Sequence, residues 1–148
     1  MSARRIILSF VLLELVIAGI AVAMDGHSIT ALQTTTRFSG RLSLFLFSGI
    51  FLQHHKPETL HAWLSDQFYL LFAIVHGIHL LELSAYVYLS GTPLIPIRVA
   101  GGFLGYAFIF LMPVLSQYQN SGKISSRTFF ITQTVFLYYV WLLFFLTY

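Results

Sequence analysis

Two histidines, His76 and His79, lie three residues apart inside a long apolar stretch of the sequence. In a helix this spacing places both imidazoles on roughly one face. A neutral imidazole offers a nitrogen lone pair near physiological pH, so a histidine inside an apolar segment is a candidate ligand for iron or zinc. The competing interpretation is that both rings are hydrogen-bonded to carbonyls or hydroxyls of neighbouring helices. The pair therefore indicates either metal or haem ligation, or polar packing between helices.

Two carboxylates are expected at a similar depth. Glu82 follows His79 by three residues and is expected to orient that histidine by a hydrogen bond. Glu14 interrupts an apolar N-terminal segment, where a carboxylate facing lipid costs at least a few kcal/mol. Glu14 therefore needs a partner, which is either a histidine or Arg41 of this chain or a group on a neighbouring protein. A zinc site made of both histidines and both glutamates is a further option, although the spacing matches no zinc motif.

Arg37 and Arg41 lie four residues apart at the start of the second apolar segment. A guanidinium group binds carboxylates in a planar fork, so these arginines are candidates to hold anionic groups such as haem propionates. The alternative is ordinary anchoring of a helix end among lipid phosphates. The haem interpretation is favoured only if the histidines are ligands.

The elements that position these residues are predicted by composition. The chain has 148 residues, of which 57% are hydrophobic and 9% charged, and its mean hydropathy is +0.82. A spanning helix needs about 20 mostly apolar residues. We therefore predict an all-α fold, a single transmembrane domain over residues 1–148 that forms a bundle of five transmembrane helices. Their expected ranges are 5–24, 38–53, 68–89, 97–115 and 128–148.

Charge and cysteine content restrict the function and the location. The absence of cysteine excludes disulfides and iron–sulfur clusters, and a net charge of +3 from scattered residues gives no support for nucleic-acid binding. Basic residues are enriched on the cytoplasmic side of membrane proteins. With the N-terminus inside, the inner side carries Arg4, Arg5, Lys56, Lys123 and Arg127, against Arg37, Arg41 and Arg98 outside. We therefore expect an integral membrane protein, in the bacterial inner membrane, with a cytoplasmic N-terminus.

Three stretches carry a family resemblance through their order and spacing. They are Ser39-Gly-Arg41-Leu-Ser43 leading into a phenylalanine-rich segment, Phe72-Ala-Ile-Val-His76-Gly-Ile-His79, and a third run with Gly102, Tyr106, Met112, Ser116 and Tyr138-Tyr139-Val-Trp141. Together they resemble small bacterial membrane proteins with a ferric-reductase-like, haem b-binding transmembrane domain. The resemblance implies that His76 is the axial ligand of one b-type haem, with His79 beside it and Arg41 near the propionates.

The last predicted helix departs from that family pattern. The family has a histidine about two turns before the tryptophan that matches Trp141, and this chain has Gln133 there. Glutamine is a poor haem ligand, so the resemblance implies at most one haem, which is either five-coordinate or bound by a further ligand that the sequence does not identify. Gln133 takes the position of the family's second ligand. The alternative is a degenerate member that keeps the scaffold and has lost the cofactor.

Three functions compete on these observations. The first is a membrane electron-transfer subunit with one haem b, which needs partner subunits because no flavin or nicotinamide motif is present. The second is a non-catalytic accessory subunit of a larger membrane complex. The third is a lipid- or isoprenoid-modifying membrane enzyme that uses Glu14, Glu82 and the histidines as acid–base groups. In each case the bilayer is a partner, and other membrane subunits are expected.

Overall fold

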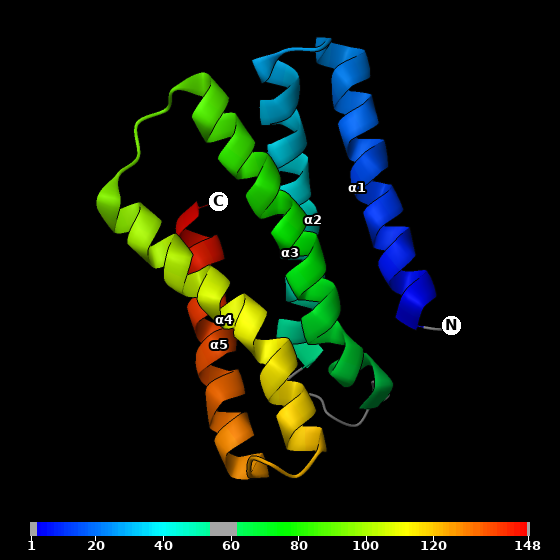
Figure 1. Cartoon of the computed structure of the whole chain (residues 1–148), viewed down its shortest axis with the longest axis vertical. Coiled ribbons are helices and arrows are strands. Elements are labelled where there is room, and N and C mark those ends of the chain that lie inside the picture. Colours follow the sequence, from blue (N-terminus) through cyan, green and yellow to red (C-terminus); the bar gives the residue numbers. More distant parts are fainter. Residues whose placement is uncertain (1–2, 54–61, 148) are drawn as a thin grey trace. The chain divides into compact units, whose positions relative to one another are not determined.

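The computed structural model describes residues 3–53 and 62–147, and the regular secondary structure in this part of the chain is entirely helical. Lys56 and Tyr148, which belong to ranges used above, lie outside the described residues. The helices are α1 (Ala3–Asp25), α2 (Ile29–Gln53), α3 (Ala62–Ser90), α4 (Pro96–Asn120) and α5 (Ser126–Thr147) (Figure 1). The predicted all-α fold with five helices is confirmed.

Helices α1, α3, α4 and α5 are long and apolar enough to cross a membrane. The stretches that meet this condition within the described residues are Arg4–Asp25, Gln67–Ser90, Val99–Asn120 and Ser126–Thr147. The chain is therefore built as an integral membrane helical protein. Helix α2 has a comparable length of 25 residues, but polar and charged side chains occur along it, and it does not reach the same apolar content.

Helix α2 begins at Ile29, well before the start at residue 38 that hydropathy predicts. Ser28 provides the N-terminal cap, because its hydroxyl accepts a hydrogen bond from the backbone N–H of Ala31 at 3.2 Å. Gly26, with φ +68°, ends the preceding helix in the left-handed conformation that glycine adopts without strain. Residues 29–37, which hydropathy assigned to a connector, therefore belong to helix α2.

The chain divides into two compact units, which are described separately. Unit 1 consists of Met1–Phe47 and Ile74–Pro93, and so contains α1, most of α2 and the second part of α3. Unit 2 consists of Ser48–Ala73 and Leu94–Tyr148, and so contains α4, α5 and the remaining parts of α2 and α3.

In unit 1, α1 and α2 are antiparallel and joined by a short turn (Figure 1). Helix α1 buries a single stripe of side chains: Glu14 and Ala21, seven residues apart, are 3% and 1% exposed. Leucines on other faces of α1, such as Leu12 and Leu15, are exposed, as expected for a helix in lipid. A carboxylate therefore lies at the centre of the one face of α1 that packs against protein.

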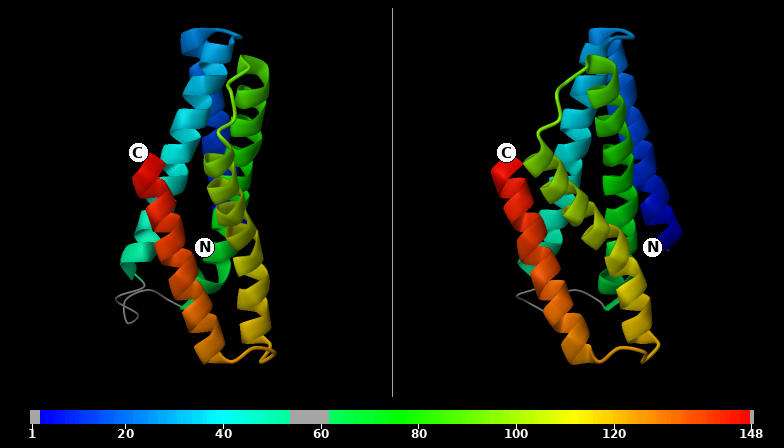
Figure 2. Two further views of the ribbon diagram at one scale, coloured as in Figure 1. Left: turned by 90° about the vertical axis from the view of Figure 1, so that its left-hand side faces the viewer. Right: turned by 60° about the vertical axis from the view of Figure 1, so that its left-hand side comes forward.

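In unit 2, α4 and α5 pack side by side as an antiparallel pair (Figure 2). The hydroxyl of Tyr139 donates a hydrogen bond to the backbone carbonyl of Gly101 at 2.9 Å. A Cβ atom on Gly105 would lie 2.5 Å from a methyl group of Leu143. The glycines of α4 thus let α5 approach closely, as small residues do in membrane helix pairs.

Aromatic side chains of α3 and α5 form much of the core of unit 2. Phe72 and Phe136 are both 0% exposed, and their ring centroids lie 6.4 Å apart in an edge-on arrangement. Tyr69 contacts the same Phe136 ring, with centroids 6.0 Å apart. Edge-on contacts of this kind add to the dispersion energy of a packed core.

Candidate functional site

The histidine pair lies on α3 within unit 1. His76 is buried, with 9% of its surface exposed, and its ring centroid lies 5.3 Å from that of His79. Glu82 and Tyr86 follow on α3 at spacings of three and four residues, which continues the same stripe of the helix. His79, Glu82 and Tyr86 each contact a residue of α2, so the stripe faces α2.

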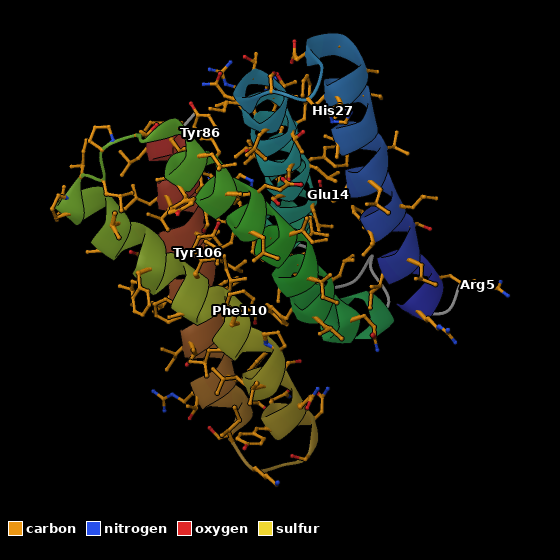
Figure 3. The ribbon with its side chains drawn as sticks, turned by 45° about the horizontal axis from the view of Figure 1, so that its top comes forward. Arg5, Glu14, His27, Tyr86, Tyr106 and Phe110 are labelled. Carbon is orange, nitrogen blue, oxygen red and sulfur yellow. The ribbon has the colours of Figure 1, made fainter. Side chains whose placement is uncertain are left out.

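A serine of α2 joins two glutamates from two other helices. Ser39 is 0% exposed, and its hydroxyl donates a hydrogen bond to Oε1 of Glu14 at 3.1 Å. The Ser39 side chain is also hydrogen-bonded to Glu82 on α3. Figure 3 shows Glu14 on the side of α1 that faces α2. One buried hydroxyl is therefore shared by two carboxyl groups, and it ties α1, α2 and α3 together.

The hydrogen count at Ser39 restricts how the two carboxyl groups are bonded. A serine hydroxyl has one hydrogen to donate and lone pairs with which to accept. When that hydrogen goes to Glu14, the contact with Glu82 is a hydrogen bond only if Glu82 brings a proton of its own. Both contacts are satisfied together when the two glutamates hold one proton between them.

Several polar atoms around Ser39 have spare hydrogen-bonding capacity. The second carboxyl oxygens of Glu14 and Glu82, the hydroxyl of Ser43 and Nδ1 of His79 are buried and have no hydrogen-bond partner among the described residues. Ser43 lies one turn after Ser39 on α2 and is 0% exposed. Buried polar groups are usually satisfied, and exceptions mark places where water, an ion or a proton is handled. The site is thus polar, buried and able to bind more than the described side chains supply.

Further polar contacts connect α2 and α3 toward the turn between α1 and α2. His79 donates a ring N–H to the backbone carbonyl of Thr36. About two turns along α3 from His79, with Glu82 between them, the Tyr86 hydroxyl accepts a hydrogen bond from the side-chain amide of Gln33 at 2.9 Å. At the turn itself, the Thr34 hydroxyl donates to a carboxylate oxygen of Asp25 at 2.7 Å.

The residues that the sequence assigned to a haem site are divided between the two units. His76 and His79 lie next to each other within unit 1. Arg41 is exposed, and its guanidinium lies 5.2 Å from the ring centroid of Phe38. Arg41 is also in the middle of α2 rather than near the helix start that hydropathy suggested, because α2 begins at Ile29. Gln133 belongs to unit 2, where its side chain is hydrogen-bonded to Tyr69.

Glu14 finds its partner inside the chain, and that partner is Ser39 rather than a histidine or Arg41. The predicted need for a partner is met without a neighbouring protein. Within the described residues, no group of three or more His, Asp or Glu side chains is arranged to hold a metal ion. The two histidines and two glutamates therefore do not form the zinc site considered above.

Sequence reasoning missed the polar residues of α2 that complete the site. The residues concerned are Gln33, Thr36, Ser39 and Ser43, spaced by three, three and four residues; Thr36 takes part through its backbone carbonyl and the others through their side chains. That spacing is the period of one helix face and was the available signal. Hydropathy assigned residues 29–37 to a connector, and the spacing of a helix face predicts contacts only within a helix.

No known protein family, curated protein or solved structure matches the chain. The resemblance to ferric-reductase-like domains therefore stays a prediction, and the function has to be argued from the site.

Among the residues that the sequence assigned to a haem, His76 is the one whose side-chain type suits an axial ligand. His76 has the type and the burial of an axial ligand, and His79 lies next to it. His79 already uses one ring nitrogen for the Thr36 carbonyl, which leaves Nδ1 for any further bond. When bound, a haem b would supply one-electron redox chemistry. The role of the protein would be to hold the iron at His76 and to tune it through His79.

We predict that Ser39→Ala destabilises the protein by about 1–3 kcal/mol, because it leaves a buried carboxyl oxygen of Glu14 without its donor. The thermal unfolding midpoint of the purified protein in detergent measures this effect. Ser84→Ala is the matched control, since Ser84 is exposed on the same helix as Glu82. It should change stability by no more than about 0.5 kcal/mol. Equal midpoints for the two variants would show that Ser39 does not support the carboxyl pair.

Proposed function

We propose that this protein is a proton-carrying subunit of a membrane complex, and that Glu14 and Glu82 together take up and release the proton. The observation that carries the proposal is the single Ser39 hydroxyl bonded to both carboxyl groups. A group that must change protonation inside a membrane needs a place where the charged and the neutral form are both tolerated. A carboxyl pair with a shared hydroxyl offers this, because the proton can be held by either member.

Electrostatics favours one proton on the pair over none. Two carboxylates close together in an apolar environment repel each other, and each has lost most of its hydration. A single proton removes one charge and allows both contacts with Ser39 to be hydrogen bonds. Uptake of a proton from water converts one carboxylate into a carboxylic acid and involves no electron. The pair titrates as a unit rather than as two independent groups.

We place the N-terminus on the cytoplasmic side of a bacterial inner membrane. Arg4 and Arg5 at the start of α1, with Lys123 and Arg127 around the turn between α4 and α5, support this orientation under the positive-inside rule. The turn between α1 and α2, which carries Asp25, then lies on the outer side.

Infrared spectroscopy tests the carboxyl pair directly. The chain has only five acidic side chains, so the C=O stretching band of a protonated carboxylic acid can be assigned by substitution. We expect this band at neutral pH in the purified protein. It should be lost in Glu14→Gln and in Glu82→Gln, because either change removes one of the two groups that share the proton.

Asp25→Asn is the control for these spectra, since Asp25 lies at the end of α1 and is bonded to Thr34 instead. It should leave the band intact. Each variant is also checked for its helical circular dichroism, so that loss of the band is not confused with loss of the fold. A neutral-pH spectrum without the band in the folded wild-type protein would refute the proposal.

Two exposed arginines on α2 support the assignment of this chain as a subunit. Arg37 and Arg41 are one turn apart, and Arg41 lies at the middle of a helix of 25 residues. We propose that α2 crosses the membrane together with the four apolar helices, which would bring Arg41 to the depth of the bilayer centre. A guanidinium group at that depth is costly in hydrocarbon and needs an anionic partner or water. We propose that the partner is a membrane helix of another subunit that carries a carboxylate.

The size of the protein in mild detergent tests this partner. The wild-type chain, extracted from its native membrane, should migrate as a complex, and the double variant Arg37→Leu, Arg41→Leu should migrate as the free chain. Arg4→Leu with Arg5→Leu is the control, because these arginines are exposed at a helix end where lipid headgroups hold them equally well. A wild-type protein that migrates as a monomer would exclude the partner.

A second candidate function, electron transfer by one haem b, is favoured by the buried pair of histidine rings. His76 is buried beside His79 on a helix long enough to cross the membrane. The two functions are compatible, because a redox reaction that releases or consumes protons can exchange them with a protonatable group in the same subunit.

Absorption spectra decide between presence and absence of haem. If His76 is the ligand, the protein expressed with ample haem shows a Soret band, which His76→Ala abolishes. His27→Ala is the control, because His27 is exposed at the turn between α1 and α2. No Soret band, or a band unchanged by His76→Ala, would exclude this ligation.

A further inference from the structure

We infer that protons reach the Glu14–Glu82 pair along one face of α2, entering from the end of unit 1 where α1 turns into α2. The residues of this path, here called the polar column, are Gln33 and Tyr86 and then Ser39 between the two glutamates, with His79 and its contact to Thr36 one turn beyond Glu82 on α3. The inference rests on the proposed function, to which it adds a route and a side of the membrane.

The polar column follows from three separate contacts between α2 and α3, all within unit 1. Gln33 meets Tyr86, Thr36 meets His79, and Ser39 meets Glu82. On α3, Tyr86, Glu82 and His79 follow one another at intervals of about one turn, so the three contacts lie along one face of that helix. From Gln33 to Ser39 the distance along the helix is about 9 Å, at about 1.5 Å per residue.

The outer end of the polar column reaches the aqueous edge of the unit. Asp25 and Thr34 form their hydrogen bond there, and the neighbouring His27 and Ser28 are exposed. Apolar leucines and isoleucines occupy the exposed faces of α1 at the depth of Glu14, and these would not conduct a proton from lipid. A proton from water therefore meets suitable groups from the turn inward and not from the side of α1.

Tyr86 is the step at which this path can be interrupted most cleanly. Its hydroxyl accepts the hydrogen bond from Gln33 and keeps its own hydrogen, which it can pass inward. Phenylalanine at this position preserves the shape of the ring and removes only the oxygen. The titratable side chains along the column are Glu14 from α1 and His79, Glu82 and Tyr86 from α3, while α2 contributes only uncharged polar groups.

Hydrogen–deuterium exchange of the carboxylic acid tests the route. The protein in lipid vesicles is transferred to deuterated buffer, and the isotope shift of the protonated carboxyl band is followed with time. In wild-type protein the shift reports how fast a proton reaches the pair. We expect Tyr86→Phe and Gln33→Leu to slow this exchange by tenfold or more while the amplitude of the band stays unchanged.

Tyr88→Phe is the matched control, because Tyr88 lies two residues away on the same helix and is 85% exposed. It should exchange at the wild-type rate. A band that exchanges equally fast in Tyr86→Phe, Gln33→Leu and Tyr88→Phe would overturn the route and leave the carboxyl pair standing. Absence of the band from the wild-type protein would instead refute the proposed function. Slower exchange in the first two variants alone is the result that supports the polar column.

Discussion

The arrangement of unit 1 depends on two carboxyl groups that must be satisfied away from water. A buried carboxyl group without hydrogen bonds is among the most costly features a membrane helix can contain. Glu14 and Glu82 come from different helices, and Ser39 on a third helix serves both. A slip of one turn in any of the three helices, about 5.4 Å, would break at least one of these contacts. The polar groups therefore fix a register that apolar packing alone leaves loosely defined.

Unit 2, unlike unit 1, is held together mainly by apolar packing. There α4 and α5 are held by small residues that allow close approach and by interlocking aromatic rings, with the Tyr139 hydroxyl bonded to a backbone carbonyl. Such contacts give a stable helix pair, but they offer no group that readily gains or loses a proton. The chemistry proposed for the chain is thus placed in unit 1.

The sequence was sufficient for the class of fold and for the residues of α3. Long apolar stretches predict membrane helices because backbone groups must be paired internally in lipid, and this rule does not depend on tertiary detail. The spacing of His79 and Glu82 placed both on one stripe of α3, which the structure confirms. The predicted hydrogen bond between them is wrong, because His79 is bonded to Thr36 and Glu82 to Ser39, while Nδ1 of His79 has no partner among the described residues. The sequence could not reveal that the stripe faces Ser39 and Thr36, since contacts between helices depend on register and rotation. It also misplaced the start of α2, because a window of average hydropathy reports polar helix faces as connectors.

Helix α2 carries polar side chains on two opposite faces. Its inner face carries the uncharged polar groups of the column, and its outer face carries two exposed arginines, so neither face suits hydrocarbon. A helix that is polar on opposite sides is stable in a membrane only between other elements that satisfy both sides. Helices α1 and α3 satisfy the inner side through Glu14, His79, Glu82 and Tyr86. The partner that we propose for Arg37 and Arg41 would satisfy the outer side, so the proposed proton site and the proposed subunit contact involve the same helix.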